Sequence, residues 1–117
     1  MAQGIYNIVI EQGSTFKLSI VYKDSLNAVM DLSGYSARMQ IRSTLTASSK
    51  MLEVTTDDVD QLWIVPSAGQ VNIKIPHTTT ALLVPSIAVY DLELESSDGE
   101  VIKLLKGKCR IEGEVTR

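Results

Sequence analysis

The fold is decided by a stretch near the C-terminal end, where residues 90–104 read YDLELESSDGEVIKL. Apolar and acidic residues alternate up to Glu95, and a second alternating run begins at Val101. Because successive side chains of a β-strand point to opposite faces, this pattern predicts a hairpin with one buried and one wet face. A two-residue turn at Asp98-Gly99 would mix the two faces. A three-residue loop over 97–99 keeps them separate and gives Gly99 the left-handed position such loops need.

The three-residue loop fixes a register for this hairpin. It predicts the pairs Leu94–Ile102, Leu92–Leu104 and Glu93–Lys103. Further along, the inward set moves from even positions to odd ones: Cys109, Ile111 and Val115. A pattern with a period of two can switch from even to odd positions only through an extra residue, so we expect a bulge or corner near residues 105–108. Gly107 is its natural site.

The same alternation recurs along the chain in the segments 5–11, 15–22, 35–42 and 71–75. Turn residues separate these segments at short intervals, which predicts eight or nine short strands in an antiparallel sandwich or barrel. One helical turn is expected near 78–83, where threonines lead into an apolar run closed by Pro85. The Ser- and Thr-rich stretch 43–50 is expected to be a mobile loop. A length of 117 residues predicts one domain, 1–117.

Composition excludes several classes of protein. With 44% apolar and 21% charged residues, the chain is neither collagen-like nor disordered. No apolar run approaches the roughly 20 residues needed to span a bilayer. The opening residues 1–4 place no basic segment before a long apolar one, so no signal peptide is expected. The single cysteine, Cys109, excludes an internal disulfide framework.

Side chains capable of catalysis are few. His77 is the only histidine and follows Pro76, so a solvated loop residue is expected rather than a catalytic base. Cys109 alternates with basic neighbours and is expected to face inward as a small apolar residue. The sequence contains no nucleophile elbow, P-loop or dinucleotide fingerprint. We therefore predict no catalytic residues and no cofactor.

Two groups of carboxylates allow a functional and a plain interpretation. Asp91, Glu93 and Glu95 share one strand face about 7 Å apart, a spacing compatible with glycoside hydrolysis. The preferred interpretation is the wet face of a sheet, offset by Lys103 on the next strand. The second group, Asp57, Asp58 and Asp60, lies in a predicted loop that could hold calcium. Because this loop lacks the glycine and distal glutamate of a calcium loop, we expect solvated turn residues and predict no metal site.

Basic residues gather at the C-terminal end. From position 101 onward there are five basic and two acidic residues, against six and twelve before it. The basic residues alternate along predicted strands with no aromatic residue among them, which argues against nucleic-acid binding. A complementary acidic surface on a neighbouring subunit suits this asymmetry better.

Several segments together resemble small all-β structural proteins of tailed bacteriophages, found among tail, baseplate and neck components. The segments are 10–16 (IEQGSTF), 31–42 (DLSGYSARMQIR), 90–94 (YDLEL), Asp98-Gly99, Gly107 and 114–117 (EVTR). The resemblance covers nearly the full length. It implies an immunoglobulin-like sandwich that packs into a virion assembly without an enzymatic step.

The expected function is therefore that of a virion structural or adaptor protein, made in the host cytoplasm. Its expected partners are copies of itself and other virion proteins, with no nucleic acid, membrane or small-molecule substrate. Possible interface residues are Trp63, Val65 and Leu45, for each of which core or loop packing is the alternative. The alternative function is a carbohydrate- or receptor-binding module, which would need an exposed aromatic platform.

Overall fold

A computed structural model describes residues 4–116 of the chain as nine strands and two short helical turns. Residues 1–3, part of the segment used to argue against a signal peptide, and Arg117 lie outside the described residues. The strands are β1 (Gly4–Ile5), β2 (Ile8–Glu11), β3 (Phe16–Val21), β4 (Ser36–Arg42), β5 (Leu52–Thr55), β6 (Leu62–Val65), β7 (Gln70–Ile75), β8 (Ser86–Glu95) and β9 (Val101–Glu112). The helical turns are η1 (Pro66–Ala68) and α1 (His77–Thr80).

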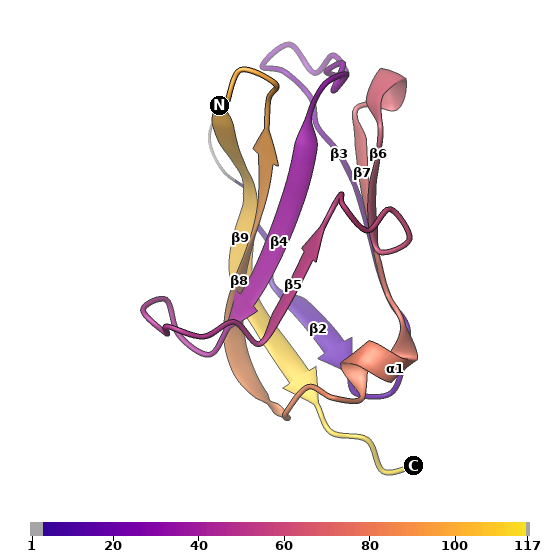
Figure 1. The fold of residues 1–117 in the computed structure, drawn as a ribbon, viewed down its shortest axis with the longest axis vertical. Helices are drawn as coiled ribbons and strands as arrows, with labels where there is room; N and C mark the ends of the chain where they lie inside the picture. The colour runs from indigo at the N-terminus through magenta and orange to yellow at the C-terminus, as the bar shows by residue number, and fades with distance from the viewer. Residues whose placement is uncertain (1–3, 117) are drawn as a thin grey trace.

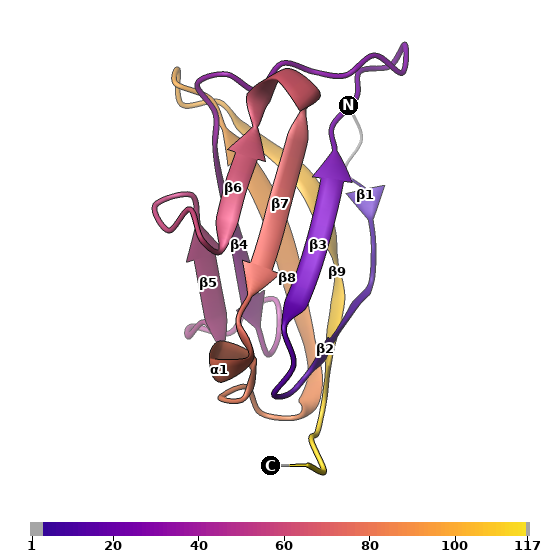
Figure 2. The same cartoon turned by 90° about the vertical axis from the view of Figure 1, so that its right-hand side faces the viewer.

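The strands form two sheets packed face to face (Figures 1 and 2). The large sheet has six strands in the order β1-β9-β8-β4-β5, with β2 continuing β1 along β9. The small sheet has the order β3-β7-β6. This is the predicted immunoglobulin-like sandwich, and it is not a closed barrel. One feature departs from the antiparallel prediction, because β1 and β2 both run parallel to β9.

The β8–β9 hairpin confirms most of the predicted register. Glu95 pairs with Val101, and Gly99 has a φ of 88° in the predicted three-residue loop. The pairs Leu94–Ile102 and Glu93–Lys103 are also as predicted. The predicted Leu92–Leu104 pair is wrong, because the register shifts between Leu92 and Glu93 and Leu92 pairs with Leu105.

The bulge therefore lies at Leu104, just before the predicted range 105–108. Leu104 is buried and Leu105 packs against the core, so two consecutive apolar side chains are accommodated on the inner side. Gly107 serves a different purpose. A Cβ at this position would lie 2.3 Å from the carbonyl oxygen of Tyr6, so glycine lets the β1–β2 connection pass close to β9.

The core lies between the sheets and consists of Ile, Leu, Val and Met side chains with Tyr22, Tyr90 and Cys109. Tyr90 is buried, and Tyr35 packs against the core. Trp63, for which interface contact and core packing were the two alternatives, is half-buried. Its neighbours Leu62 and Ile64 face the core instead, because the inward positions of β6 are the even ones.

The connections are partly as predicted. The helical turn α1 begins one residue before the predicted 78–83 segment and ends at Thr80, whose buried hydroxyl donates to the carbonyl of Ser14 at 2.7 Å. The 3₁₀ turn η1 was not predicted. In the loop 43–50, the carbonyl of Ala47 accepts a 2.9 Å hydrogen bond from Arg42 on β4, which ties the loop to the large sheet.

Candidate functional site

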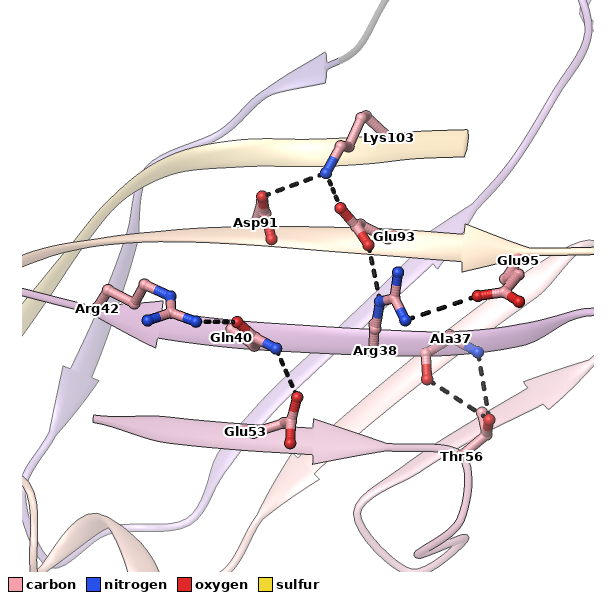
Figure 3. A network of polar contacts seen from close by, with 10 residues as sticks. All are labelled: Ala37, Arg38, Gln40, Arg42, Glu53, Thr56, Asp91, Glu93, Glu95 and Lys103. Atoms are coloured by element: carbon pink, nitrogen blue, oxygen red, sulfur yellow. Dashed lines mark hydrogen bonds and ion pairs between the residues drawn. The ribbon is translucent and has the colours of Figure 1, made fainter. Parts of the chain in front are cut away.

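The outer face of the large sheet carries two neighbouring groups of interacting charged and polar side chains (Figure 3). They come from the central strands β4 and β8 and from the flanking strands β5 and β9. Along each strand these side chains alternate with core residues. Because successive side chains of a strand point to opposite faces, they all lie on the solvent side of the sheet. The face is therefore the wet face predicted for the 91–95 carboxylates.

The first group is a network centred on Glu93. Its side chain lies between two cations, Arg38 on β4 and Lys103 on β9, and the residue is only 9% exposed. The Arg38 Nε–Glu93 Oε1 distance is 2.8 Å, and Lys103 forms an ion pair with the other carboxylate oxygen. Lys103 also reaches Asp91 at 3.8 Å, and Arg38 reaches Glu95 at 3.6 Å. All three carboxylates are thus engaged by cations, as predicted for Lys103 but not for Arg38.

The second group of polar contacts is separate from this network and reaches the edge strand β5. Arg42 donates to Gln40 at 3.0 Å, and Gln40 donates to Glu53 at 2.5 Å. Lys50 forms a 3.0 Å ion pair with the other oxygen of Glu53. The hydrogen bond from Lys50, and then that from Gln40, lowers the pKa of Glu53 below its ordinary value.

Beside the network the same face is hollowed and becomes apolar. A hollow of about 390 Å³ is lined by Ile5 of β1, Val89 of β8 and Leu45 of the loop 43–50, together with Gln40, Arg42, Tyr90, Asp91, Lys106 and Gly107. Ile5 is 76% exposed and Leu45 is 88% exposed. The hollow thus combines apolar side chains with both acidic and basic residues. Such a surface can bind an apolar side chain of a partner that is flanked by polar groups.

The three predicted interface residues do not come together. Leu45 lines the hollow over the large sheet. Trp63 and Val65 lie on the other side of the sandwich, at the outer positions of the edge strand β6, where they pair with Asn72 and Gln70. Val65 is exposed and Trp63 is half-buried, so Trp63 does not present an open platform.

The remaining sequence candidates have plain structural surroundings. Cys109 is fully buried, as predicted, and burial raises the pKa of its thiol to about 11. His77 is exposed at the start of α1, as predicted.

In the acidic loop, Asp58 accepts hydrogen bonds from the Asp60 backbone at 3.1 Å and from Gln61 at 3.0 Å. These contacts are those of turn residues. Across residues 4–116, His, Cys, Asp and Glu side chains form no group of three that could hold a metal ion. The absence of metal, cofactor and catalytic activity stays a prediction.

Sequence reasoning missed Arg38, Ile5 and Val89 as members of this face. Their alternation with buried neighbours was visible, and Arg38 sits between Ala37 and Met39, which are both buried. What the sequence does not contain is the order of strands in the sheet, which places β4 beside β8 and β1 beside β9.

This sequence matches no protein-family model and no curated protein. No helix among residues 4–116 has both the length and the apolar character needed to cross a bilayer.

Proposed function

We propose that the protein is a non-enzymatic structural or adaptor component of a tailed-bacteriophage virion. It assembles through face and edge-strand contacts with copies of itself and with tail, baseplate, neck or head subunits. The assignment to a phage rests on the sequence resemblance. The assignment to assembly rests on the surface of the sandwich.

The observation that carries the proposal is the apolar hollow on the outer face of the large sheet. Ile5 and Leu45 expose most of their surface there, on different chain segments that the fold brings to one place. Apolar side chains gathered in a hollow and rimmed by charge are typical of a protein contact surface.

The charges around the hollow suit a selective contact. Lys106, Arg42 and Asp91 all line the hollow, and Asp91 also belongs to the ion-paired carboxylates of the Glu93 network. Rim charges contribute to the choice of partner and to the rate of association more than to affinity. A virion subunit, which must join the correct neighbour among many similar sandwiches, benefits from such a rim.

The test is to purify particles produced from the genome that encodes this chain and to quantify the protein in them by mass spectrometry. We expect a fixed number of copies per particle that survives density-gradient purification. Its absence from purified, infectious particles would contradict the proposal.

A matched pair of variants tests the hollow itself. Leu45→Asp places a charge at the hollow, whereas Leu26→Asp places one at an equally exposed leucine outside it, since the two residues are 88% and 86% exposed. We expect Leu45→Asp to lower incorporation into particles at least several-fold and Leu26→Asp to leave it unchanged. Equal incorporation of the two variants would exclude the hollow as the contact surface.

A further inference from the structure

We propose that two copies of this protein join edge to edge through β3, in antiparallel register about a two-fold axis at Ser19. This inference rests on the proposed function, because it names one of the contacts by which the subunit assembles. It specifies the strand, the partner and the pairing. The result is a continuous sheet in the order β6-β7-β3-β3-β7-β6.

The backbone of β3 offers a free hydrogen-bonding edge. In Figure 2, β3 is the outermost strand of the small sheet, and within residues 4–116 it pairs only with β7. The hydrogen bond from the Tyr22 N–H to the Gly69 carbonyl, 2.8 Å long, fixes the phase of this ladder. Because backbone groups of an antiparallel strand alternate in direction, Lys17, Ser19 and Val21 point theirs away from β7. Three N–H and three C=O groups thus face the open side.

The inner side chains of β3 are incompletely covered at the same edge. On β7, the inward residues Val71, Ile73 and Ile75 are at most 2% exposed. On β3, the inward residues Phe16, Leu18 and Ile20 are all only partly buried. A hollow of about 590 Å³, lined by Val9, Glu11, Ser14, Thr15, Phe16 and Lys17, adjoins the start of the strand. A strand added to β3 would cover these side chains with its own inward residues.

The other edges are shorter or already obstructed. β5 and β6 have four residues each, against six in β3. On β6 the Leu62 N–H already donates to the Asp58 carbonyl, and Pro66 follows the strand. β5 carries Glu53, and β2 is separated from β1 by two residues. Short, charged and interrupted edges are the devices that keep strands from pairing with other chains. β3 retains a regular, uninterrupted edge with Lys17 as its one charge.

The sequence of β3 selects a second copy as the partner. Side chains of β3 alternate between the two faces of the sheet, so each residue must lie opposite a residue of the same face in the second copy. The two residue numbers of every opposed pair must therefore be both even or both odd. The register centred on Ser19 uses all three free residues, pairing Ser19 with Ser19 and Lys17 with Val21. It places Leu18 opposite Ile20, apolar against apolar. The register centred on Lys17 would instead set two lysines directly opposite each other, which is unfavourable.

Disulfide trapping tests the register. In the proposed pair the two Ser19 Cα atoms lie about 5.5 Å apart, within disulfide range, so Ser19→Cys is expected to form a covalent dimer under mild oxidation. Val21→Cys is the control, because its two copies would be offset by four residues, or about 13 Å. The native Cys109 is buried and does not compete. Equal trapping at both positions would overturn the register.

Charge variants at position 21 test the same pairing without oxidation. Val21 is 44% exposed, so substitution there leaves the core intact. In the dimer, position 21 of each copy lies opposite Lys17 of the other copy. Val21→Glu would therefore create two attractive charge pairs, and Val21→Lys would create two repulsive ones. By sedimentation velocity we expect the dissociation constant to fall roughly twofold to tenfold for Val21→Glu and to rise by a similar factor for Val21→Lys. Identical shifts for the two variants would overturn the proposed pairing.

A proline variant separates edge pairing from loss of a side chain. Ser19→Pro removes an N–H that faces the open side, which an edge strand tolerates. Ser19→Ala loses the same 2.7 Å hydrogen bond to Asn72 but keeps the N–H. We expect Ser19→Pro to be monomeric and Ser19→Ala to remain dimeric.

The two proposals can fail independently. A wild-type chain that is monomeric at all concentrations but present in purified particles would overturn the β3 pairing and leave the proposed function standing. A β3-paired dimer that is absent from particles would support the pairing and overturn the virion role.

Discussion

The first strands of the chain form two neighbouring edges of the sandwich, and these edges are built in opposite ways (Figure 2). At the large sheet, β1 and β2 are separated by Tyr6 and Asn7, and side chains replace part of the backbone ladder. Tyr90 donates to the Tyr6 carbonyl at 2.5 Å, and the Asn7 amide oxygen accepts from the Lys108 N–H at 3.0 Å. At the small sheet, β3 is regular from Phe16 to Val21.

The difference shows how one stretch of chain protects one edge and leaves the other available. An interrupted strand held by side-chain hydrogen bonds is a poor template for pairing with another chain, whereas a regular strand is a good one. The irregular edge is expected to contribute to the stability of the monomer. The regular edge is expected to contribute to assembly and little to the stability of the monomer.

The largest expected effect comes from filling the space left by Gly107. Gly107→Ala places a Cβ 2.3 Å from the Tyr6 carbonyl oxygen, a backbone atom that cannot move without displacing the β1–β2 connection. We expect the free energy of unfolding, measured by urea denaturation, to fall by about 2–3 kcal/mol. Gly113→Ala is the control, because its Cβ would first meet the Pro85 side chain at 3.4 Å. Equal losses for the two variants would contradict a specific steric role for Gly107 beside the Tyr6 carbonyl.

The next effect concerns Tyr90, which holds the irregular edge and is 4% exposed. Burial, and then the neighbouring Tyr6 and Cys109, raises the pKa of Tyr90 from 10.0 to about 12. The neutral phenol is thus favoured in the folded state, and its contribution to stability is present below pH 10 and lost as the pH rises toward 12. The loss is about 2–3 kcal/mol.

Tyr90→Phe tests this contribution directly. At pH 7 the variant lacks the hydrogen bond to Tyr6 and should be about 1 kcal/mol less stable than the wild type. Between pH 10 and 12 the wild type should lose stability more steeply than the variant, so that the two curves converge or cross. Both chains retain Cys109, so the difference between the curves reports the phenol together with its interaction with the Cys109 thiol. Parallel curves throughout this range would contradict the assigned role of the phenol.

A smaller effect is expected from the ion pairs that join β8 to β9. Lys103→Met leaves Glu93 with Arg38 as its remaining cation. Because both cations are about half-exposed, solvent screens the loss, and we expect a decrease of about 1 kcal/mol in the free energy of unfolding. Lys108→Met, an exposed lysine on the same strand, is the control and should change little. A variant at 103 that matches the control would show that the network is energetically neutral.

The β8–β9 hairpin shows which features of the fold can be predicted from the sequence. Alternation over 90–104 and the position of Gly99 predicted the sheet faces and most of the register, because both are local properties. The bulge was predicted too far along the sequence, because it lies at Leu104. The switch of inward residues from even to odd positions indicates that an extra residue is needed before Cys109, but it does not indicate which residue. The parallel pairing of β2 with β9 joins residues about 100 positions apart, and nothing local indicates it.

The candidate surface was less accessible than the fold. Leu45 was singled out as an exposed apolar residue, and the structure places it at the hollow. Trp63 and Val65 were singled out on the same grounds, but they lie on the small sheet. Which exposed residues gather on one face depends on strand order and on the path of the 43–50 loop, and both are set by packing of the whole domain.

The smallest effect concerns a third edge, β5, which is protected by charge rather than by irregularity. Lys50, and then Gln40, lowers the pKa of Glu53 from its ordinary value of 4.5. The carboxylate is thus favoured in the folded state, and its contribution to stability is present above pH 4.5 and lost as the pH falls through the lower, folded pKa. Lys50→Ala should move the pKa of Glu53, followed by NMR titration of its side chain, back toward 4.5.

The matched control is Lys23→Ala, at an exposed lysine outside this contact, which should leave the titration of Glu53 unchanged. Because Glu53 is open to solvent, the change in overall stability should be slight, and only the titration is expected to resolve it. If the pKa of Glu53 stayed low in Lys50→Ala, Gln40 and the charge of Arg38 would account for the shift. The carboxylate of Glu53 on β5 would then be stabilised by side chains on the outer face of the large sheet rather than by Lys50 in the preceding loop. The charge that protects the β5 edge would then depend on the outer face of the large sheet.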